Sequence, residues 1–426
     1  MSSQILFATA LLTYIGILFK TRELLSPIGV FCLLWFSAAA IADIQQFKDF
    51  SFQIPWVFET YMVIFISGLS VFSIGFVFCE RISLIPIYIR TSNKYMMVFN
   101  ALAILSVMAV ALRILYYGFD FMKIFVSIGD LDLKNETPDA IPFVHYFEIL
   151  TPFIALCALF ELRTSSNLSF RRKLILIAYV FYSIFFYSLV FSASRGTFLI
   201  IFTGAIFLYG RIGLLKLSHI IVAGVILISL MSLLSFVRMP AETLTNSYLG
   251  EERIQLFLSP IYTYIAFNFE NLNSLIVAGN NPTYFLYSLK FLLWPFLKND
   301  YETGVIEFSN FDTLFFNART LVYPFYHDLG LFGCFLFPAL IAIVLVWIGN
   351  KSKRNPTFVM LLMALQKPII FSFFGNYFFG ELILFIPLVL IYYLCNIYRS
   401  SLELIGPPGR VISEAVECLA ITKTEK

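Results

Sequence analysis

One arginine stands alone in a long apolar part of the sequence. Arg195, in the stretch FSASRGTFLI, is the only charged residue between Leu174 and Gly210. Ser194 and Gly196 flank it, and both are residue types that favour turns. A guanidinium beside the free N–H groups at the start of a helix is suited to binding phosphate. The alternative interpretation is an anchor, whose side chain only reaches lipid phosphates at the end of a membrane span.

Further residues that could do chemistry lie in the only long hydrophilic part of the sequence, 238–320. It is rich in carboxylates and aromatic residues, and an arginine stands at or near each end. Its candidate residues are Arg238, Glu251, Glu252, Arg253 and Arg319. An acidic loop of this length can be a solvated spacer. The mixture of arginines and carboxylates, however, suits sugar and pyrophosphate better than a spacer.

A histidine and an aspartate stand next to each other in the stretch YPFYHDLGLFG, where polar residues lead into the next apolar run. His327 and Asp328 could supply a general base near the membrane surface. The pair could equally be a structural cap or an ion pair. Both interpretations remain open at the level of the sequence.

The sequence gives no sign of a metal or cofactor site. Its six cysteines are scattered, mostly inside apolar runs, without a CxxC pair: Cys32, Cys79, Cys157, Cys334, Cys395 and Cys418. Such cysteines are typical of small core residues. We expect neither a bound metal nor a required divalent ion.

The composition shows which solvent these residues meet. Hydrophobic residues make up 60% of the 426 positions and charged residues only 13%, which is too apolar for a water-soluble surface. Apolar runs of about 17 to 25 residues recur, each long enough to cross a bilayer as a helix. No alternating pattern favours a barrel. We therefore predict an all-α, polytopic integral membrane protein.

Breaks at charge clusters predict about eleven transmembrane helices. The spans are 4–19, 25–41, 56–79, 95–117, 143–161, 174–192, 197–210, 217–237, 321–349, 357–373 and 379–397. The first third of 321–349 is expected to lie outside the hydrocarbon. Two further apolar stretches, 254–269 and 284–297, are interpreted as short interfacial or re-entrant helices. If both crossed, the count would be thirteen.

The loops between the spans predict an orientation and a division of the chain. Alternate loops are rich in lysine and arginine, which places them in the cytoplasm, the N-terminus outside and the C-terminus inside. The hydrophilic part and Arg195 then share the outer face. The predicted parts are an N-terminal bundle of about eight spans (1–237), a large outer loop (238–320), a C-terminal group of three spans (321–397) and a cytoplasmic tail (398–426).

Three charges inside predicted spans have separate interpretations. Lys367 and Glu381 are expected to form a buried pair that fixes the last hairpin, with a role in lining a lipid-phosphate cavity as the alternative. Arg113 is interpreted as an anchor near the outer end of its span.

The SASRG turn between two spans, the large outer loop and the YPFYHDLGLFG element together resemble the O-antigen polymerase (Wzy-type) family, the oligosaccharide repeat-unit polymerases. The matching positions are Ser194-Arg195-Gly196 and Asp328-Leu329-Gly330 with Gly333. The resemblance covers the architecture of most of the chain, but its motifs cover only a small part.

The resemblance implies a glycosyltransferase that uses no nucleotide sugar. Repeat units linked to undecaprenyl pyrophosphate would be joined at the outer face of the bacterial inner membrane, as in the O-antigen of lipopolysaccharide. Asp328, His327 and Glu252 become the expected catalytic residues. Arg195, Arg238, Arg253 and Arg319 become the expected substrate-binding residues.

The expected partners are membrane lipid, the lipid-linked oligosaccharides and a chain-length regulator protein, with no nucleic acid, since the net charge is only +3. An O-antigen ligase and a polysaccharide flippase or transporter are the alternative functions. Transporters usually show repeated halves with binding residues at the membrane midplane. This sequence shows no such repeat, and its unusual charges gather at one face.

Overall fold

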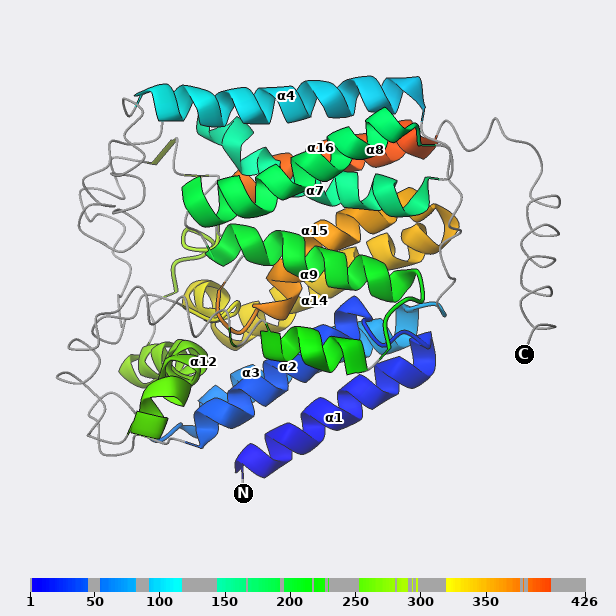
Figure 1. Ribbon diagram of the computed structural model, residues 1–426. Coiled ribbons are helices and arrows are strands. Elements are labelled where there is room, and N and C mark those ends of the chain that lie inside the picture. The colour runs from blue at the N-terminus through cyan, green and yellow to red at the C-terminus, as the bar shows by residue number, and fades with distance from the viewer. Residues whose placement is uncertain are drawn as a thin grey trace, which may run out of the picture.

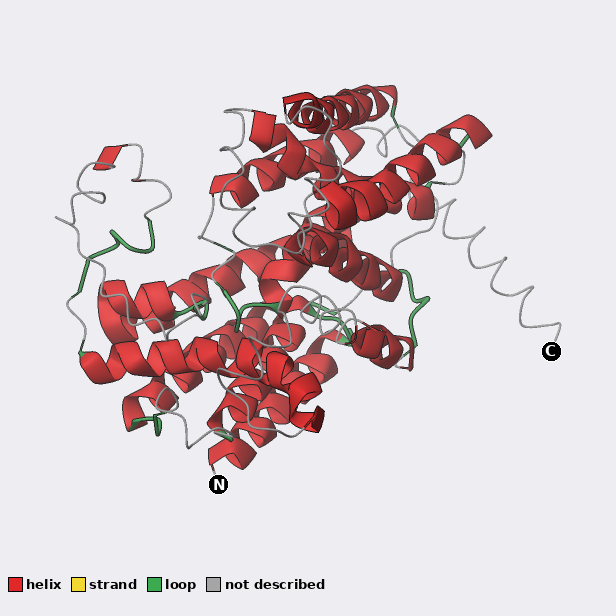
Figure 2. Cartoon of the chain, turned by 60° about the vertical axis from the view of Figure 1, so that its left-hand side comes forward, coloured by secondary structure: helices red, strands yellow, loops and turns green. Residues whose placement is uncertain are grey.

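The computed structural model describes most of the helical part of the chain. It covers residues 2–44, 54–81, 92–116, 144–165, 168–191, 195–216, 218–226, 253–279, 282–289, 319–375 and 382–399, with a few single positions between them. Within these ranges the chain is helical and forms no sheet, as Figure 2 shows. The all-α prediction is therefore confirmed for this part of the chain.

The helices follow one another in a simple order (Figure 1). They are α1 (Ser2–Thr21), α2 (Pro27–Asp43), α3 (Phe58–Phe78), α4 (Asn93–Tyr116), α7 (Val144–Thr164), α8 (Phe170–Phe181), η1 (Tyr182–Phe191), α9 (Arg195–Arg211), α12 (Arg253–Ala278), α14 (Tyr323–Arg354), η2 (Pro356–Phe358), α15 (Val359–Ile370) and α16 (Leu382–Arg399). The π-helix η1 directly continues α8, and the 3-10 helix η2 leads into α15.

Among the described residues, four helices are long and apolar enough to cross a membrane: α1, α3, α4 and α14. Shorter apolar helices, among them α2 and α9, accompany them. This supports a helical membrane protein, while the count of eleven spans stays a prediction. The predicted turn before the lone arginine, residues 192–194, lies outside the described residues, which run to Phe191 at the end of η1 and start again with Arg195 in α9.

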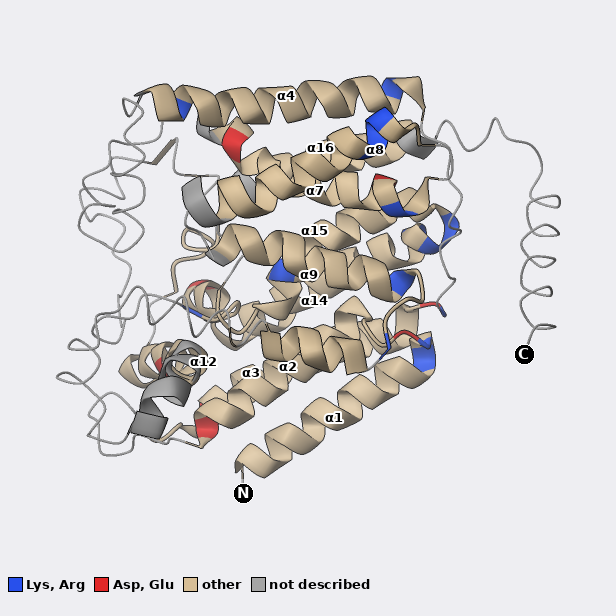
Figure 3. Ribbon diagram, viewed as in Figure 1, with Lys and Arg blue, Asp and Glu red and all other residues tan. Residues whose placement is uncertain are grey.

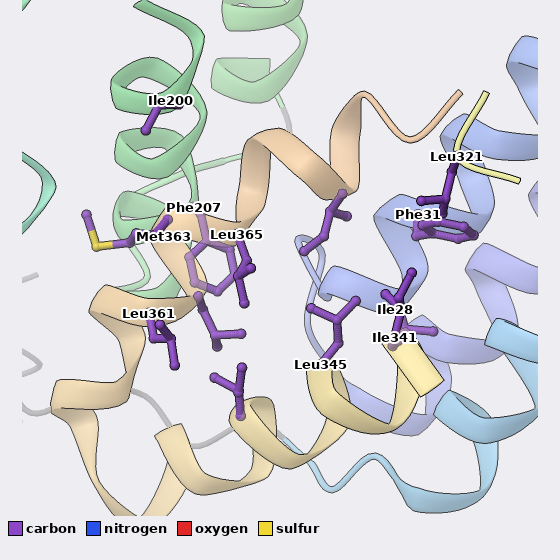
Figure 4. Close-up of a cluster of buried hydrophobic side chains, with 14 of the residues drawn as sticks. Ile28, Phe31, Ile200, Phe207, Leu321, Ile341, Leu345, Leu361, Met363 and Leu365 are labelled. Atoms are coloured by element: carbon purple, nitrogen blue, oxygen red, sulfur yellow. The ribbon is translucent and has the colours of Figure 1, made fainter. Parts of the chain in front are cut away.

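The core lies where α2, α9, α14 and α15 meet (Figure 4). Ile28 of α2, Leu345 of α14 and Leu361 of α15 are among its buried side chains. Small residues let the helices approach, as is usual for helices packed in a bilayer. At Gly68 of α3, an added Cβ would lie only 2.3 Å from the ring of Phe36 on α2.

Many of the basic residues of the described helices lie at one end of the bundle, called here the basic end (Figure 3). Arg211, at the end of α9, is 3.3 Å from Glu23 after α1 and donates to Ser352 of α14 at 2.7 Å. Arg163 of α7 donates to the hydroxyl of Tyr209 at 2.8 Å. The ends of α1, α7, α9 and α14 therefore meet on one side, as the alternating basic loops predicted.

The opposite end, called here the polar end, is where α3 and α14 begin. The hydroxyl of Tyr326 on α14 donates to Glu59 in the first turn of α3 at 2.8 Å. The two helices run in parallel from there, because their far ends also meet: Asn350 donates to the carbonyl of Phe78 at 2.8 Å. Ser2 of α1 and Asp43 of α2 meet at the same end, 2.5 Å apart.

The structure corrects the predicted helix 254–269. Helix α12 does not stop there but runs on to Ala278, 26 residues in all. Its second half carries Glu270, Asn271 and Asn273, whose side chains are fully buried. It packs on α2 and α3, and Figure 1 shows it near end-on at the polar end of the bundle. The polar residues that suggested a loop are thus internal contacts of a helix.

Two other interpretations of charged residues have different outcomes. Arg113 forms an ion pair with Glu148 of α7, with 2.9 Å between Nη1 and Oε2. The guanidinium therefore joins α4 to α7, which the anchor interpretation did not predict. Lys367 lies in the last turn of α15, but its expected partner Glu381 is outside the described residues.

Candidate functional site

The site begins with the unusual start of α14. Gly330 has φ 60° and ψ −142°, a conformation open to glycine at little cost, and it separates the first turns of α14 from the rest. At Gly333, an added Cβ would lie 2.2 Å from the carbonyl oxygen of Phe325. Both glycines of the Asp-Leu-Gly-x-x-Gly element are therefore required by the backbone, which folds back on itself here.

Asp328 sits at this fold and is fully buried. Its Oδ1 accepts the N–H of Tyr287 at 3.0 Å and the hydroxyl of Thr283, and its Oδ2 accepts the N–H of Ser288 at 2.7 Å. The carbonyl oxygen of Asp328 also accepts the N–H of Tyr284 at 3.3 Å. Both carboxylate oxygens thus hold the turn 282–289 in place. This geometry favours the cap interpretation of Asp328 over that of a free general base.

His327 faces the same turn. Its Nδ1 lies 3.1 Å from the hydroxyl oxygen of Thr283, and its ring stacks on Tyr287 with centroids 4.9 Å apart. The side chain is 1% exposed. The turn 282–289, about forty residues earlier in the chain, therefore holds both members of the His-Asp pair.

Arg319 completes the group. Its guanidinium carbon lies 4.9 Å from the ring centre of Tyr323 and 5.5 Å from that of Tyr287, within the range of cation–π attraction. Burial lowers the pKa of Arg319, but an arginine stays charged at any physiological pH. Arg319 and His327 thus share one tyrosine, Tyr287. We call Arg319, His327, Asp328, Thr283 and Tyr287 the Asp328 cluster.

The other predicted site residues are less well defined. Arg195 and Arg253 are the first residues of α9 and α12, and their side chains are outside the described part of the chain. Arg238 and Glu252 lie wholly outside it. Because Arg211 closes α9 at the basic end, some 25 Å away along the helix, Arg195 lies toward the polar end. The structure therefore places Arg195 and the Asp328 cluster toward the same end.

Glu270 is a residue that the sequence did not single out. It is fully buried, and the indole N–H of Trp56 donates to its Oε1 at 3.1 Å. Burial raises the pKa of Glu270 to about 8, against smaller lowering effects of Trp56 and the backbone of Ile54. The only sequence signal was the polar run Asn268 to Asn273 inside an otherwise apolar stretch.

Asn273 connects α12 to the start of α3. Its Oδ1 accepts the hydroxyl of Thr60 at 2.7 Å and the N–H of Val57 at 3.3 Å. The neighbouring Glu59 accepts from Tyr326, next to His327. One pair of contacts therefore joins α12 to the start of α3, and the Tyr326–Glu59 contact joins the start of α3 to the residue before His327.

Comparison of the chain with protein-family models, with curated proteins and with solved structures found no match. The site is therefore characterised by its own geometry. Within the described ranges, no three histidine, cysteine or acidic side chains are grouped as metal ligands. What the described residues of the Asp328 cluster offer is one fixed cation, one imidazole and an aromatic surface.

Proposed function

We propose that this protein is a lipid-linked repeat-unit polymerase, a glycosyltransferase that joins undecaprenyl-pyrophosphate-linked oligosaccharides. The observation that carries the proposal is Arg319, a cation held over two tyrosine rings beside His327 at the end away from the basic loops. Phosphate groups favour arginine forks, and sugars favour aromatic faces and hydroxyl partners. The motif resemblance of the SASRG and DLGLFG elements points to the same chemistry.

The proposed reaction is a single transfer. The acceptor sugar's hydroxyl oxygen bonds to the anomeric carbon of the donor, and the bond from that carbon to the pyrophosphate oxygen breaks. The hydroxyl proton passes to a base, and the leaving pyrophosphate takes up negative charge. Arg319 and Arg195 would stabilise that charge, which is the main demand such a step makes on a protein.

The geometry changes the roles proposed for the acidic residues. Asp328 becomes a positioning residue, because its two oxygens are occupied by Thr283, Tyr287 and Ser288. His327 remains a candidate base, as does Glu252. Arg238 and Arg253 remain candidates for binding the second lipid-linked substrate.

The proposal includes a location. The eleven spans would lie in a bacterial inner membrane with the basic end in the cytoplasm, the N-terminus outside and the C-terminus inside. Both substrates would then reach the polar end from the outer leaflet. A chain-length regulator protein would be a further partner there.

Deletion of the gene, followed by gel analysis of surface polysaccharide, tests the function. A polymerase predicts loss of the polymer ladder while caps of a single repeat remain. Loss of every attached repeat would indicate a ligase. Unchanged glycans, or repeat units trapped on the cytoplasmic side, would contradict the polymerase and favour another role or a flippase.

Complementation of the deletion strain tests the arginines. Arg195→Ala and Arg319→Ala should each lower polymer formation by about 30- to 1000-fold, or ~2–4 kcal/mol, and lysine should restore only a small part because it lacks the fork. Arg171→Lys, on an exposed arginine at the basic end, is the matched control and should leave polymer unchanged. If lysine restored full activity at position 195 or 319, that residue would be an anchor.

A further inference from the structure

Glu270 occupies an unusual place for a carboxyl group. It lies on α12 where the helix packs on α2 and α3, and its side chain is fully buried. Phe269, its neighbour, contacts the rings of Trp35 and Trp56 at 5.5 and 5.8 Å between centroids. A carboxylate loses its hydration in such surroundings, and the neutral acid is favoured.

The hydrogen bonds of Glu270 satisfy only part of the group. The indole of Trp56 donates to Oε1 at 3.1 Å, and a backbone hydrogen bond from Ile54 also favours the carboxylate, whereas Oε2 has no hydrogen-bond partner among the described residues. A buried ionised carboxylate needs more donors than this, or a paired cation. A protonated carboxyl tolerates the site far better.

In the described part of the chain, the helices packed against α12 are α2 and α3, and neither carries a lysine, arginine or histidine. Asp43, at the end of α2, accepts from Ser2 and Tyr61 at 2.5 Å each. Glu59, in the first turn of α3, accepts from Tyr326. Asp43 is one of the causes that raise the pKa of Glu270, after burial. The surroundings therefore oppose a negative charge at position 270.

We propose that Glu270 carries a proton while α12 is docked on α2 and α3, and that loss of this proton releases α12 from the bundle. The released helix frees Asn273 from Thr60 and Val57, so the change reaches the first turn of α3. The device is a proton-dependent contact at the polar end of the molecule. It is independent of the glycosyltransferase proposal, because it concerns the docking of a helix and not a substrate.

The direction of the pH dependence follows from the two states. The pKa is about 8 with α12 docked, and its ordinary value in a solvated helix is about 4.5. Docking is therefore most favourable at a pH below the undocked pKa of about 4.5. The docking constant falls about tenfold for each pH unit between that pKa and the docked pKa of about 8, and it then levels off. Between pH 6 and pH 9 the docking constant should fall by roughly a hundredfold.

Hydrogen exchange of the full-length protein in lipid nanodiscs tests the proposal. Peptides from α12 of the wild type and of Glu270→Gln are compared at equal pH between 6 and 9, which cancels the intrinsic pH dependence of exchange. The ratio of the two exchange rates, wild type over variant, should rise roughly a hundredfold between pH 6 and pH 9. Peptides from the buried helix α15 should stay equal in both proteins. The same pH response in both proteins would overturn the proposal.

Trp56→Phe provides a second test that keeps the carboxyl. The indole N–H lowers the pKa of Glu270, so its removal should raise the docked-state pKa. The fall in α12 protection should then continue to higher pH before it levels off. This variant decides the matter if Glu270→Gln does not fold. A levelling-off that stays at the wild-type pH or moves to lower pH would contradict the proposal.

Discussion

Gly330 allows the first turns of α14 to change direction before the long apolar part of the helix begins. Its φ of 60° and ψ of −142° are strained for any residue with a Cβ. Gly330→Ala should therefore lower the free energy of unfolding by about 1–3 kcal/mol. The measurement is thermal unfolding in detergent, in which the exposure of the buried cysteines reports the fraction unfolded.

Gly349, later on the same helix, is the matched control. A Cβ there would meet nothing within 4 Å, and its φ is not positive. Gly349→Ala should leave stability unchanged or raise it slightly, since alanine favours helix. If the two variants behaved alike, the conformation at Gly330 would not limit stability.

At the residue scale, the sequence identified Asp328 and His327 but left their role open. The reason is physical: a carboxylate's role depends on its hydrogen-bond donors, and those of Asp328 come from Thr283, Tyr287 and Ser288. These donors lie about forty residues earlier, and two of them are backbone N–H groups that no side-chain pattern reveals. Glu270 was missed for a similar reason, because its burial depends on tertiary packing.

At the element scale, Arg172 joins three helices near the basic end. Its Nε and Nη2 donate to Glu161 of α7 at 2.9 and 2.8 Å, and its Nη1 donates to Asn100 of α4 at 2.6 Å. Arg172→Met would leave Glu161 buried without its cation. The free energy of unfolding should fall by about 3–5 kcal/mol.

Its neighbour Arg171 is exposed and serves as the matched control in the same unfolding assay. Arg171→Met should change stability by less than about 0.5 kcal/mol. Adding Glu161→Leu to Arg172→Met should recover much of the loss, because an apolar pair removes the unpaired charge. If the double variant were no more stable than Arg172→Met, the ion pair would not explain the effect.

The sequence predicted the apolar helices better than it predicted α12. Helices such as α3 are defined by unbroken apolar runs, so their ends follow from the nearest charges. In α12 the residues Glu270, Asn271 and Asn273 are polar yet buried, and their pattern is the same as that of a loop. Only contacts with α2 and α3 distinguish the two, which is why the helix was predicted to stop too early.

At the scale of the whole molecule, the basic loops predicted which helix ends meet. Short loops rich in lysine and arginine stay on one side of the membrane, so the helix ends that they connect lie together. The contacts of Arg211 with Glu23 and Ser352 agree with that grouping. The side of the membrane on which this end lies is still a prediction. It requires a test on intact cells.

Two phenylalanines of similar exposure, one at each end of the bundle, are suitable labelling positions for that test. Phe58, at the start of α3 on the polar end, is 78% exposed, and Phe170, at the start of α8 on the basic end, is 83% exposed. In a background without the native cysteines, Phe58→Cys should react with an impermeant maleimide added to intact cells, whereas Phe170→Cys should react only after the membrane is opened. Ser352 would be a poor probe, because it is buried against Arg211.

The labelling result bears directly on the proposed function. Lipid-linked repeat units are joined outside the cytoplasm in the proposed reaction, so Arg319 and His327 must share the side of Phe58. The connection is structural: Glu59, next to Phe58, accepts from Tyr326, next to His327. If Phe170→Cys reacted in intact cells and Phe58→Cys did not, the Asp328 cluster would face the cytoplasm. The polymerase proposal would then be excluded together with the orientation.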